Sequence, residues 1–327
     1  MKKLLYYPSF EVQNYNWLKF ALLYIDELRP IIPTEGDRYL SGEYSKIISD
    51  TDLINQYRPN YEDGTRATLD AIDVIENILR EPNRYSNLLG GQHFVEEWKD
   101  TGSHKYIIFE QKYTDQWKEF CIRERLGKPK GEGVIVAKSL GLLYMTLLTN
   151  VISEKMRLST ITDYQNLDNI SILARRQIPT DNTINVAKGI ISLKLPKNLE
   201  NMSFGKIIEY RNRRDFKKCL HAFHADLEKY LKDLEDGKAE KGFLDMGYEG
   251  VSEYYLDMAL LGVEMEAFAF SSWMAITSPE NYAALTSTVL TGTTLLINSI
   301  YTINKLWRHT EGTRMQRKYL TELSKIQ

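Results

Sequence analysis

Residues 3–33 read KLLYYPSFEVQNYNWLKFALLYIDELRPIIP, and this stretch decides the fold class of the N-terminal part. Lys3 to Tyr7 has the apolar character of a short strand, which a proline ends. Asn14 is a suitable N-cap, and the apolar residues after it recur at the spacing of one helical face. Pro30 is expected to end this helix, and Ile31–Pro33 to form the next strand. A strand, a helix and a second strand in this order predict a βαβ unit and a partly parallel sheet.

The rest of the first 200 residues alternates helical and extended patterns. Residues 34–64 are polar and rich in turn formers, which predicts an excursion without regular structure. Apolar spacing and glycines predict the elements that follow: a helix over residues 65–81, a loop over 83–91, a strand over 106–112, a helix over 114–126, an exposed connector over 127–133 and a core helix around 140–152. We therefore expect an α/β lobe with a small, partly parallel sheet over residues 1–200.

The pattern changes to helix after about residue 200. Ser203 is a suitable cap for a long helix over residues 203–235. Its apolar residues step by four and three, which is heptad spacing and predicts one buried seam: Phe216, Leu220, Phe223, Leu227, Tyr230 and Leu234. Two further helices are expected over residues 251–278 and 281–308, with Pro279 between them. These features predict an all-helical lobe over residues 201–327 and a protein dominated by helix.

Residues 283–303 carry no charge and match a membrane-spanning helix in length. Nine of these 21 positions are Thr, Ser or Asn, which lowers the hydrophobicity of the segment. A helix without charge on any side is also typical of a helix buried inside a lobe. We expect a buried helix here, and insertion into a membrane is the alternative.

Composition limits the partners and the compartment. The 327 residues carry a net charge of −2, with a pI of about 6.3, so no overall positive field attracts DNA or an anionic membrane. Cys121 and Cys219 are the only cysteines, and two cysteines can form neither a disulfide framework nor a four-thiolate zinc site. The sequence lacks glycine motifs for phosphate or dinucleotide binding and the motifs of zinc peptidases and serine hydrolases, so we expect no cofactor and no metal. Free thiols, and an N-terminal apolar run too short for a secretory signal, predict a cytoplasmic protein.

Short landmarks are spread over most of the chain: Tyr6-Tyr7-Pro8, Trp17, Tyr144-Met145, Thr162-Asp163, Tyr210-Arg211 and Tyr319-Leu320. This set resembles an uncharacterised bacterial family, a domain of unknown function. Its members open with a Tyr-Tyr-Pro strand and a Trp-containing helix, continue with a Tyr-Met helix and a Thr-Asp element, and end near a Tyr-Leu pair. Tyr210 departs from the Phe of the family's Phe-Arg pair. The resemblance assigns no catalytic residue. It implies a bacterial cytosolic protein of a kind often encoded in phage-defence or toxin-like gene clusters.

One arrangement on the long helix has a mechanistic implication. Arg214 and His221 are seven residues apart, which places them about 20° apart on one helical face, directed away from the apolar seam. An Arg and a His held side by side can stabilise charge at phosphorus and move a proton, as metal-independent RNA cleavage requires. The spacing resembles the Arg-x4–6-His motif of HEPN-type ribonucleases, in which Asp215 would be the polar residue after the Arg. Neighbouring lysines and His224 favour a solvated surface instead.

Other polar residues have a structural interpretation. An Asp that follows a Thr, as Asp163 follows Thr162, more often bonds backbone amides than acts as a catalytic carboxylate. His93 and His104 lack a third ligand and do not indicate zinc.

We expect a component of a bacterial defence or conflict (anti-phage) system that works through contacts with a protein partner or with a second copy of itself. One alternative is an HEPN-like ribonuclease that acts as a dimer on RNA through Arg214 and His221. The other is a membrane-disrupting effector that releases residues 283–303.

Overall fold

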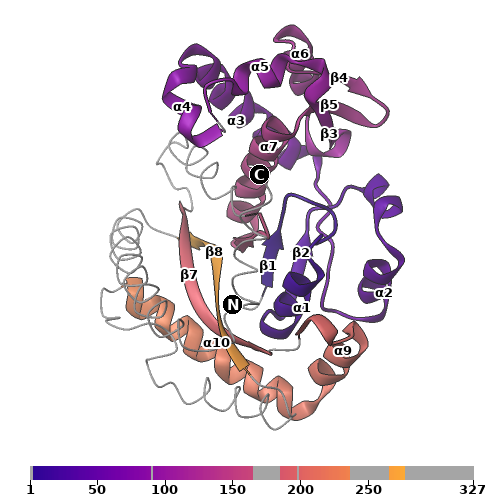
Figure 1. The fold of residues 1–327 in the computed structure, drawn as a ribbon, viewed down its shortest axis with the longest axis vertical. Coiled ribbons are helices and arrows are strands. Elements are labelled where there is room, and N and C mark those ends of the chain that lie inside the picture. The colour runs from indigo at the N-terminus through magenta and orange to yellow at the C-terminus, as the bar shows by residue number, and fades with distance from the viewer. Residues whose placement is uncertain (1–2, 90, 165–184, 197–198, 236–264, 277–327) are drawn as a thin grey trace.

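The computed structural model describes residues 3–89, 91–164, 185–196, 199–235 and 265–276. Helices dominate these residues, as predicted, and two sheets accompany them. Figure 1 shows two lobes, one built around a five-stranded sheet and one that contains a three-stranded sheet. We call them the large-sheet lobe and the small-sheet lobe.

The βαβ unit predicted at the N-terminus is confirmed. Strands β1 (Lys3–Tyr6) and β2 (Glu27–Pro30) pair in parallel, and helix α1 (Tyr15–Tyr24) connects them. The side chain of Asn14 caps α1 by accepting a hydrogen bond of 3.0 Å from the amide of Trp17. The predicted cap is therefore the observed one.

The helix ends, and the next strand begins, several residues earlier in the sequence than predicted. Ile25 already has extended dihedral angles, with φ −110° and ψ 136°. Leu28, which was expected on the helix, pairs with Leu4 in the sheet and is 1% exposed. Pro30 disfavours helical dihedral angles in the residue before it, and the backbone groups of residues 27–30 are satisfied by pairing in the sheet.

The large sheet has the strand order β2-β1-β6-β8-β7. Strand β6 (Ser159–Ile161) pairs in parallel with β1 on the side opposite β2. Strands β7 (Asn185–Pro196) and β8 (Met265–Ile276) continue the sheet through antiparallel pairs. The sheet is therefore partly parallel, as predicted.

The helix predicted over residues 251–278 is wrong for residues 265–276. These residues form β8, which pairs with β7 from Met265↔Pro196 to Ile276↔Asn185. Short apolar runs are ambiguous between helix and strand, and the aromatic residues of this run favour a strand once a partner strand is present. Residues 251–264 and the uncharged segment 283–303 lie outside the described residues.

The small-sheet lobe contains the predicted helices and the predicted strand, but the strand ends at Phe109 and residues 110–112 form a 3-10 turn. Its elements are α3 (Tyr61–Arg80), α4 (Pro82–Leu89), α5 (Phe94–Lys99), η2 (Thr101–Ser103), β3 (His104–Phe109), η3 (Glu110–Lys112), α6 (Asp115–Arg123), β4 (Gly127–Lys130), β5 (Gly133–Ala137) and α7 (Lys138–Met156). The three strands form an antiparallel sheet in the order β3-β5-β4. Helices α3, α6 and α7 confirm the periodic segments of the sequence.

Three segments predicted to be irregular are ordered elements. Residues 34–64 contain η1 (Thr34–Tyr39) and α2 (Gly42–Asp50), and α2 buries Tyr44 and Ile47. The predicted loop at 83–91 is largely α4, and the predicted connector at 127–133 is the hairpin of β4 and β5. At the turn of this hairpin Gly131 has φ +58°, a backbone conformation that glycine adopts without strain. Each of these short elements depends on contacts that the local sequence does not reveal.

The single helix predicted over residues 203–235 is broken into α9 (Phe204–Asn212) and α10 (Arg214–Glu235). Arg213 between them is extended, with φ −64° and ψ 134°. In one straight helix the buried residues of α9 and those of α10 would point about 165° apart, at 3.6 residues per turn. The break lets both apolar faces turn onto the same core. The predicted cap at Ser203 is confirmed, because its side chain accepts a hydrogen bond from the amide of Lys206.

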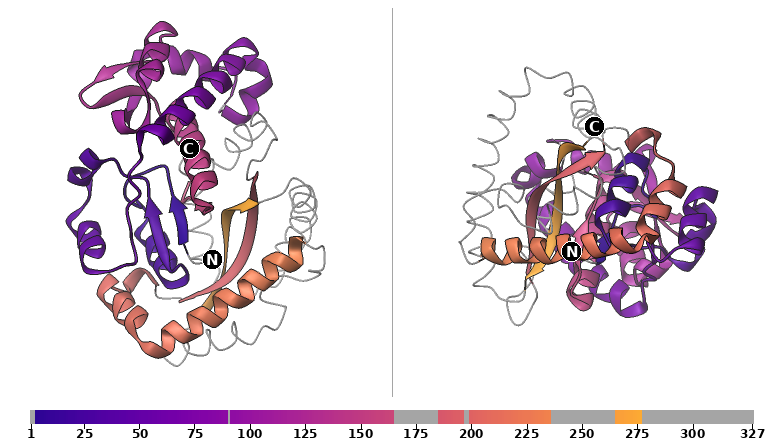
Figure 2. Two further views of the ribbon diagram at one scale, coloured as in Figure 1. Left: turned by 180° about the vertical axis from the view of Figure 1, so that it is seen from behind. Right: turned by 90° about the horizontal axis from the view of Figure 1, so that it is seen from below.

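Two hydrophobic cores lie on opposite faces of β1. Leu4 and Tyr6 belong to a core with α1, α9 and α10, whereas Leu5 and Tyr7 belong to a core with α3 and α7. Figure 2 shows α9 and α10 running along the base of the large-sheet lobe. The first core joins residues 4–54 with residues 199–223. The proposed division of the chain at residue 200 depends on segments outside the described residues and stays a prediction.

Candidate functional site

The carboxyl ends of the parallel strands meet the small-sheet lobe. Strand β1 lies between β2 and β6. The connection that leaves the end of β1 leads through α1 to β2 on one side, whereas the connection that leaves the end of β2 leads through the small-sheet lobe to β6 on the other side. Ligand and partner sites in sheets of this kind concentrate at such a switch point. We define the lobe junction as residues 8–10 and 34–39 of the large-sheet lobe together with residues 106–112 of the small-sheet lobe.

Asp163 fixes the loop that follows β1. Its Oδ1 accepts a hydrogen bond of 2.7 Å from the hydroxyl of Tyr6, and it also accepts from the amides of Gln13 and Asn14. Burial raises the pKa of this carboxyl to about 6, although these hydrogen bonds act in the opposite direction. The contacts agree with the interpretation of Asp163 as a structural carboxylate that bonds backbone amides.

Three aromatic rings form a cluster across the lobe junction. The ring centroids of Phe10 and Phe109 are 5.1 Å apart, and those of Tyr39 and Phe109 are 5.7 Å apart. Phe10 and Tyr39 complete the triangle at 6.5 Å. Phe109 is buried, but Tyr39 is 57% exposed. We call Phe10, Tyr39 and Phe109 the aromatic cluster.

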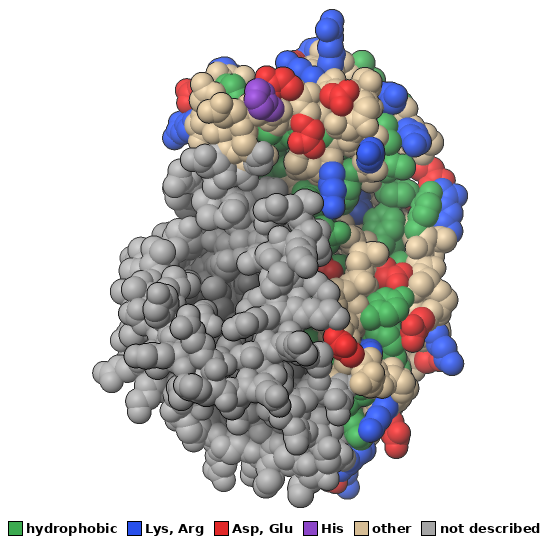
Figure 3. Space-filling model, viewed as in Figure 1, with side chains coloured by type: hydrophobic (Ala, Val, Ile, Leu, Met, Phe, Trp, Pro, Cys, Tyr) green, Lys and Arg blue, Asp and Glu red, His purple; other side chains and the backbone are tan. Residues whose placement is uncertain are grey.

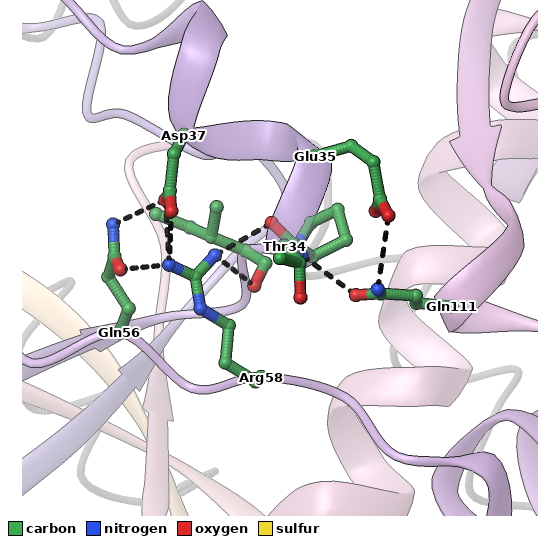
Figure 4. A network of polar contacts seen from close by, with 8 residues as sticks. Thr34, Glu35, Asp37, Gln56, Arg58 and Gln111 are labelled. Carbon is green, nitrogen blue, oxygen red and sulfur yellow. Dashed lines mark hydrogen bonds and ion pairs between the residues drawn. The ribbon is translucent and has the colours of Figure 1, made fainter.

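A polar network holds the segment that carries Tyr39 (Figure 4). Arg58 donates to the carbonyls of Ile32 and Pro33 at 3.1 and 2.7 Å, and its Nη2 donates to both carboxylate oxygens of Asp37 at 2.7 and 2.6 Å. Charge-assisted bonds of this kind fix orientation as well as adding energy. The start and the middle of η1 are therefore tied to the segment that leads into α3.

Gln111 connects the same segment to the other lobe. Its Oε1 accepts a hydrogen bond of 2.7 Å from the amide of Thr34, and its Nε2 donates to Glu35 at 3.3 Å. A further bond across the junction runs from the hydroxyl of Tyr106 to the carbonyl of Pro8 at 3.2 Å. The junction is thus a packed contact with defined polar partners.

Lys112 is buried at the centre of the lobe junction. It is 2% exposed, and its Nζ lies 3.5 Å from the sulfur of Met145 and 4.6 Å from the ring centroid of Phe10. Burial lowers the pKa of this amine to about 7. The sequence alone gives no signal for this residue, which is predicted as the last residue of an ordinary strand.

Arg214 and His221, the predicted catalytic pair, are both exposed on α10, and so is Asp215. The buried side of the same helix carries Phe216, Leu220 and Phe223, which are 0–3% exposed. The first half of the predicted seam is therefore confirmed. The side chains of Leu227, Tyr230 and Leu234 lie outside the described part.

His224 does not belong to the solvated face on which it was placed. It is fully buried, with its Nε2 2.7 Å from the carbonyl oxygen of Tyr24 and its Nδ1 3.3 Å from a carboxylate oxygen of Asp26. Burial alone would raise the pKa of Asp26, but the hydrogen bond to His224 and nearby positive charges outweigh it, and the pKa is lowered. His224 lies four residues after Leu220, which places it beside the apolar stripe. It connects α10 to the end of α1.

The two other histidines of the described residues, His93 and His104, do not share a ligand site. His93 is exposed, whereas His104 is buried with its Nε2 2.8 Å from the carbonyl oxygen of Trp98. Within the described ranges no group of three His, Cys, Asp or Glu residues could hold a metal ion.

No helix in the described part of the chain combines the length and the apolar character that crossing a membrane requires. No protein-family model matches the chain, and no curated protein or solved structure matches it significantly.

Proposed function

We propose that this protein is a component of a bacterial anti-phage defence system and works through protein–protein contacts, with the aromatic cluster at the lobe junction as its docking surface. The resemblance of the sequence landmarks supports the biological setting. The exposed ring of Tyr39 is the observation that supports the surface.

Tyr39 has the properties of an interface hot spot. Tyr and Arg are enriched among the residues that dominate binding energies. The Tyr39 ring rests on Phe10 and Phe109, and the guanidinium of Arg38 lies 5.1 Å from its centroid. A ring held in this way loses little conformational freedom when a partner covers it.

The surroundings of Tyr39 match the polar rim of an interface. Arg38 forms an ion pair with Glu132 across the lobe junction, and both side chains remain partly exposed. Figure 3 shows hydrophobic side chains gathered between the lobes, bordered by charged ones. An apolar centre with a charged edge is typical of surfaces that bind another protein.

We expect Tyr39→Ala to weaken binding to the partner by about thirtyfold or more, because truncating a hot spot costs about 2 kcal/mol or more. The measurement is co-purification of the tagged full chain with the product of each neighbouring gene, followed by titration of the pair that forms. Tyr61→Ala is the matched control, since Tyr61 is 79% exposed at the start of α3. Equal affinities of the Tyr39→Ala variant and the original protein would rule out this docking surface.

An HEPN-like ribonuclease is the second candidate. The observation that favours it is the joint exposure of Arg214 and His221 on one helix. Purified protein incubated with total RNA without added metal tests this candidate. Cleavage that disappears in His221→Ala would make the ribonuclease the leading function.

A further inference from the structure

Lys112 is enclosed by groups from both lobes. It ends η3, and Gln111 beside it bonds to η1 of the other lobe. Its own amine instead lies between the sulfur of Met145 on α7 and the ring of Phe10 in the loop after β1. The carbonyl of Lys112 accepts a hydrogen bond of 2.7 Å from the hydroxyl of Tyr144, which fixes the backbone at this point.

No anionic group among the described residues pairs with this amine. The titratable groups of the surrounding elements mostly have other partners: Glu11 bonds to Ser41, Glu35 to Gln111, Asp37 to Arg58, Asp63 to Lys155 and Tyr144 to Lys112's own carbonyl. Glu110 is exposed, and burial raises the pKa of the Tyr113 phenol, which keeps it neutral. A thioether and an aromatic ring offset only a small part of the free energy needed to remove an ammonium from water. Protonation of Lys112 therefore opposes the packing of the two lobes.

We propose that Lys112 is a proton-controlled latch between the lobes. The neutral amine keeps Phe10 packed against Lys112, and the ammonium loosens this contact. The geometry that carries the proposal is a buried amine without a counter-charge, placed where one lobe meets the other.

The direction of the pH response follows from linkage. The closed arrangement lowers the pKa of Lys112 to about 7 from 10.5, so the open arrangement binds more protons between these values. The closed arrangement is therefore favoured increasingly as the pH rises from about 7 to about 10, and it has lost this advantage below pH 7. Near neutral pH both forms of the amine are present.

The latch acts on the docking surface. Phe10 contacts both Lys112 and Tyr39, so loosening Phe10 removes one support of the exposed ring. This consequence rests on the proposed function, whereas the latch itself can be tested on the isolated protein.

Hydrogen exchange of the isolated full chain tests the latch. Protection factors for peptides that cover residues 7–13 and 34–39 are measured at pH 6.5 and pH 9.0, corrected for the intrinsic pH dependence of exchange. We expect protection to be at least about tenfold higher at pH 9.0. A peptide from α1 should change less.

Two variants make the test specific. Lys112→Met keeps the length of the side chain without a charge and should abolish the pH response, whereas Lys105→Met, at an exposed position on β3, should keep it. Lys112→Arg, which stays charged, should show low protection at both pH values. Equal protection of the original protein at the two pH values would overturn the proposal, even if a Lys112 variant fails to fold. A pH response that persists in Lys112→Met would also overturn it.

Discussion

Asp163 and Lys112 are two buried ionisable residues with opposite surroundings. Asp163 receives hydrogen bonds from Tyr6 and from backbone amides, whereas Lys112 has only a sulfur and a ring beside its amine. Burial shifts both pKa values toward the neutral form. One residue therefore fixes a loop, and the other leaves the lobe junction sensitive to protons.

We expect Asp163→Asn to change the pH dependence of stability below neutral pH. The folded protein holds a proton on Asp163 up to about pH 6, whereas the unfolded chain releases it near pH 3.8, so this stabilisation is complete below pH 3.8 and lost as the pH rises through 6. Relative to Asp163→Asn, the free energy of unfolding of the original protein should fall by on the order of 2–3 kcal/mol from pH 4 to pH 7. Urea unfolding at a series of pH values measures this difference.

Asp52→Asn provides the control, because Asp52 is an exposed carboxylate. The free energy of unfolding of this variant should change with pH in the same way as that of the original protein. The same result for Asp163→Asn would contradict the pKa shift assigned to Asp163.

At the scale of elements, helix α10 packs through a narrow apolar stripe. Phe216, Leu220 and Phe223 are buried in the core that also contains β1 and α1. His224 adds a polar contact to the end of α1. The stripe and this contact together fix the helix against the large sheet.

Leu220→Ala should lower the free energy of unfolding by about 2–5 kcal/mol, because it removes buried methyl groups and leaves a cavity. Lys217→Ala, on the exposed side of the same helix, should change stability by less than about 0.5 kcal/mol. Chemical denaturation of both variants decides this point. Similar small effects of the two substitutions would show that the stripe does not pack as described.

Long periodic elements could be predicted from the sequence, and short ones could not. Helices α1 and α7 carry continuous apolar faces, and Asn14 and Ser203 act as the predicted caps. Helix α2, in contrast, depends on Glu11, whose carboxylate bonds the amide and the hydroxyl of Ser41 from a distant part of the chain. Strand β8 depends on β7, which no local pattern reveals.

The candidate site was only partly predictable for the same reason. The Thr162-Asp163 element was identified from local sequence, and its structural role agrees with the observed contacts. The aromatic cluster consists of residues 10, 39 and 109, which meet only when two lobes pack together. Side chains that are far apart in sequence share no spacing that a periodicity could detect.

At the scale of the whole molecule, the lobe junction combines three properties. It lies at the carboxyl ends of parallel strands, it presents an exposed aromatic ring, and it contains a buried amine without a counter-charge. Arg214 and His221 lie on α10, which runs along the base of the large-sheet lobe (Figure 2). The two proposed functions therefore depend on different surfaces and can be separated by substitutions.

Protection against phage is the measurement that tests the central claim most directly. The efficiency of plating of a phage panel is compared on bacteria that carry the gene with its neighbours, either unchanged or as Tyr39→Ala, Tyr61→Ala or His221→Ala. The docking function predicts that Tyr39→Ala loses protection while the other two variants keep it, at equal protein levels. Full protection by Tyr39→Ala, with loss of protection in His221→Ala, would contradict docking through the lobe junction and establish the α10 surface as the functional one.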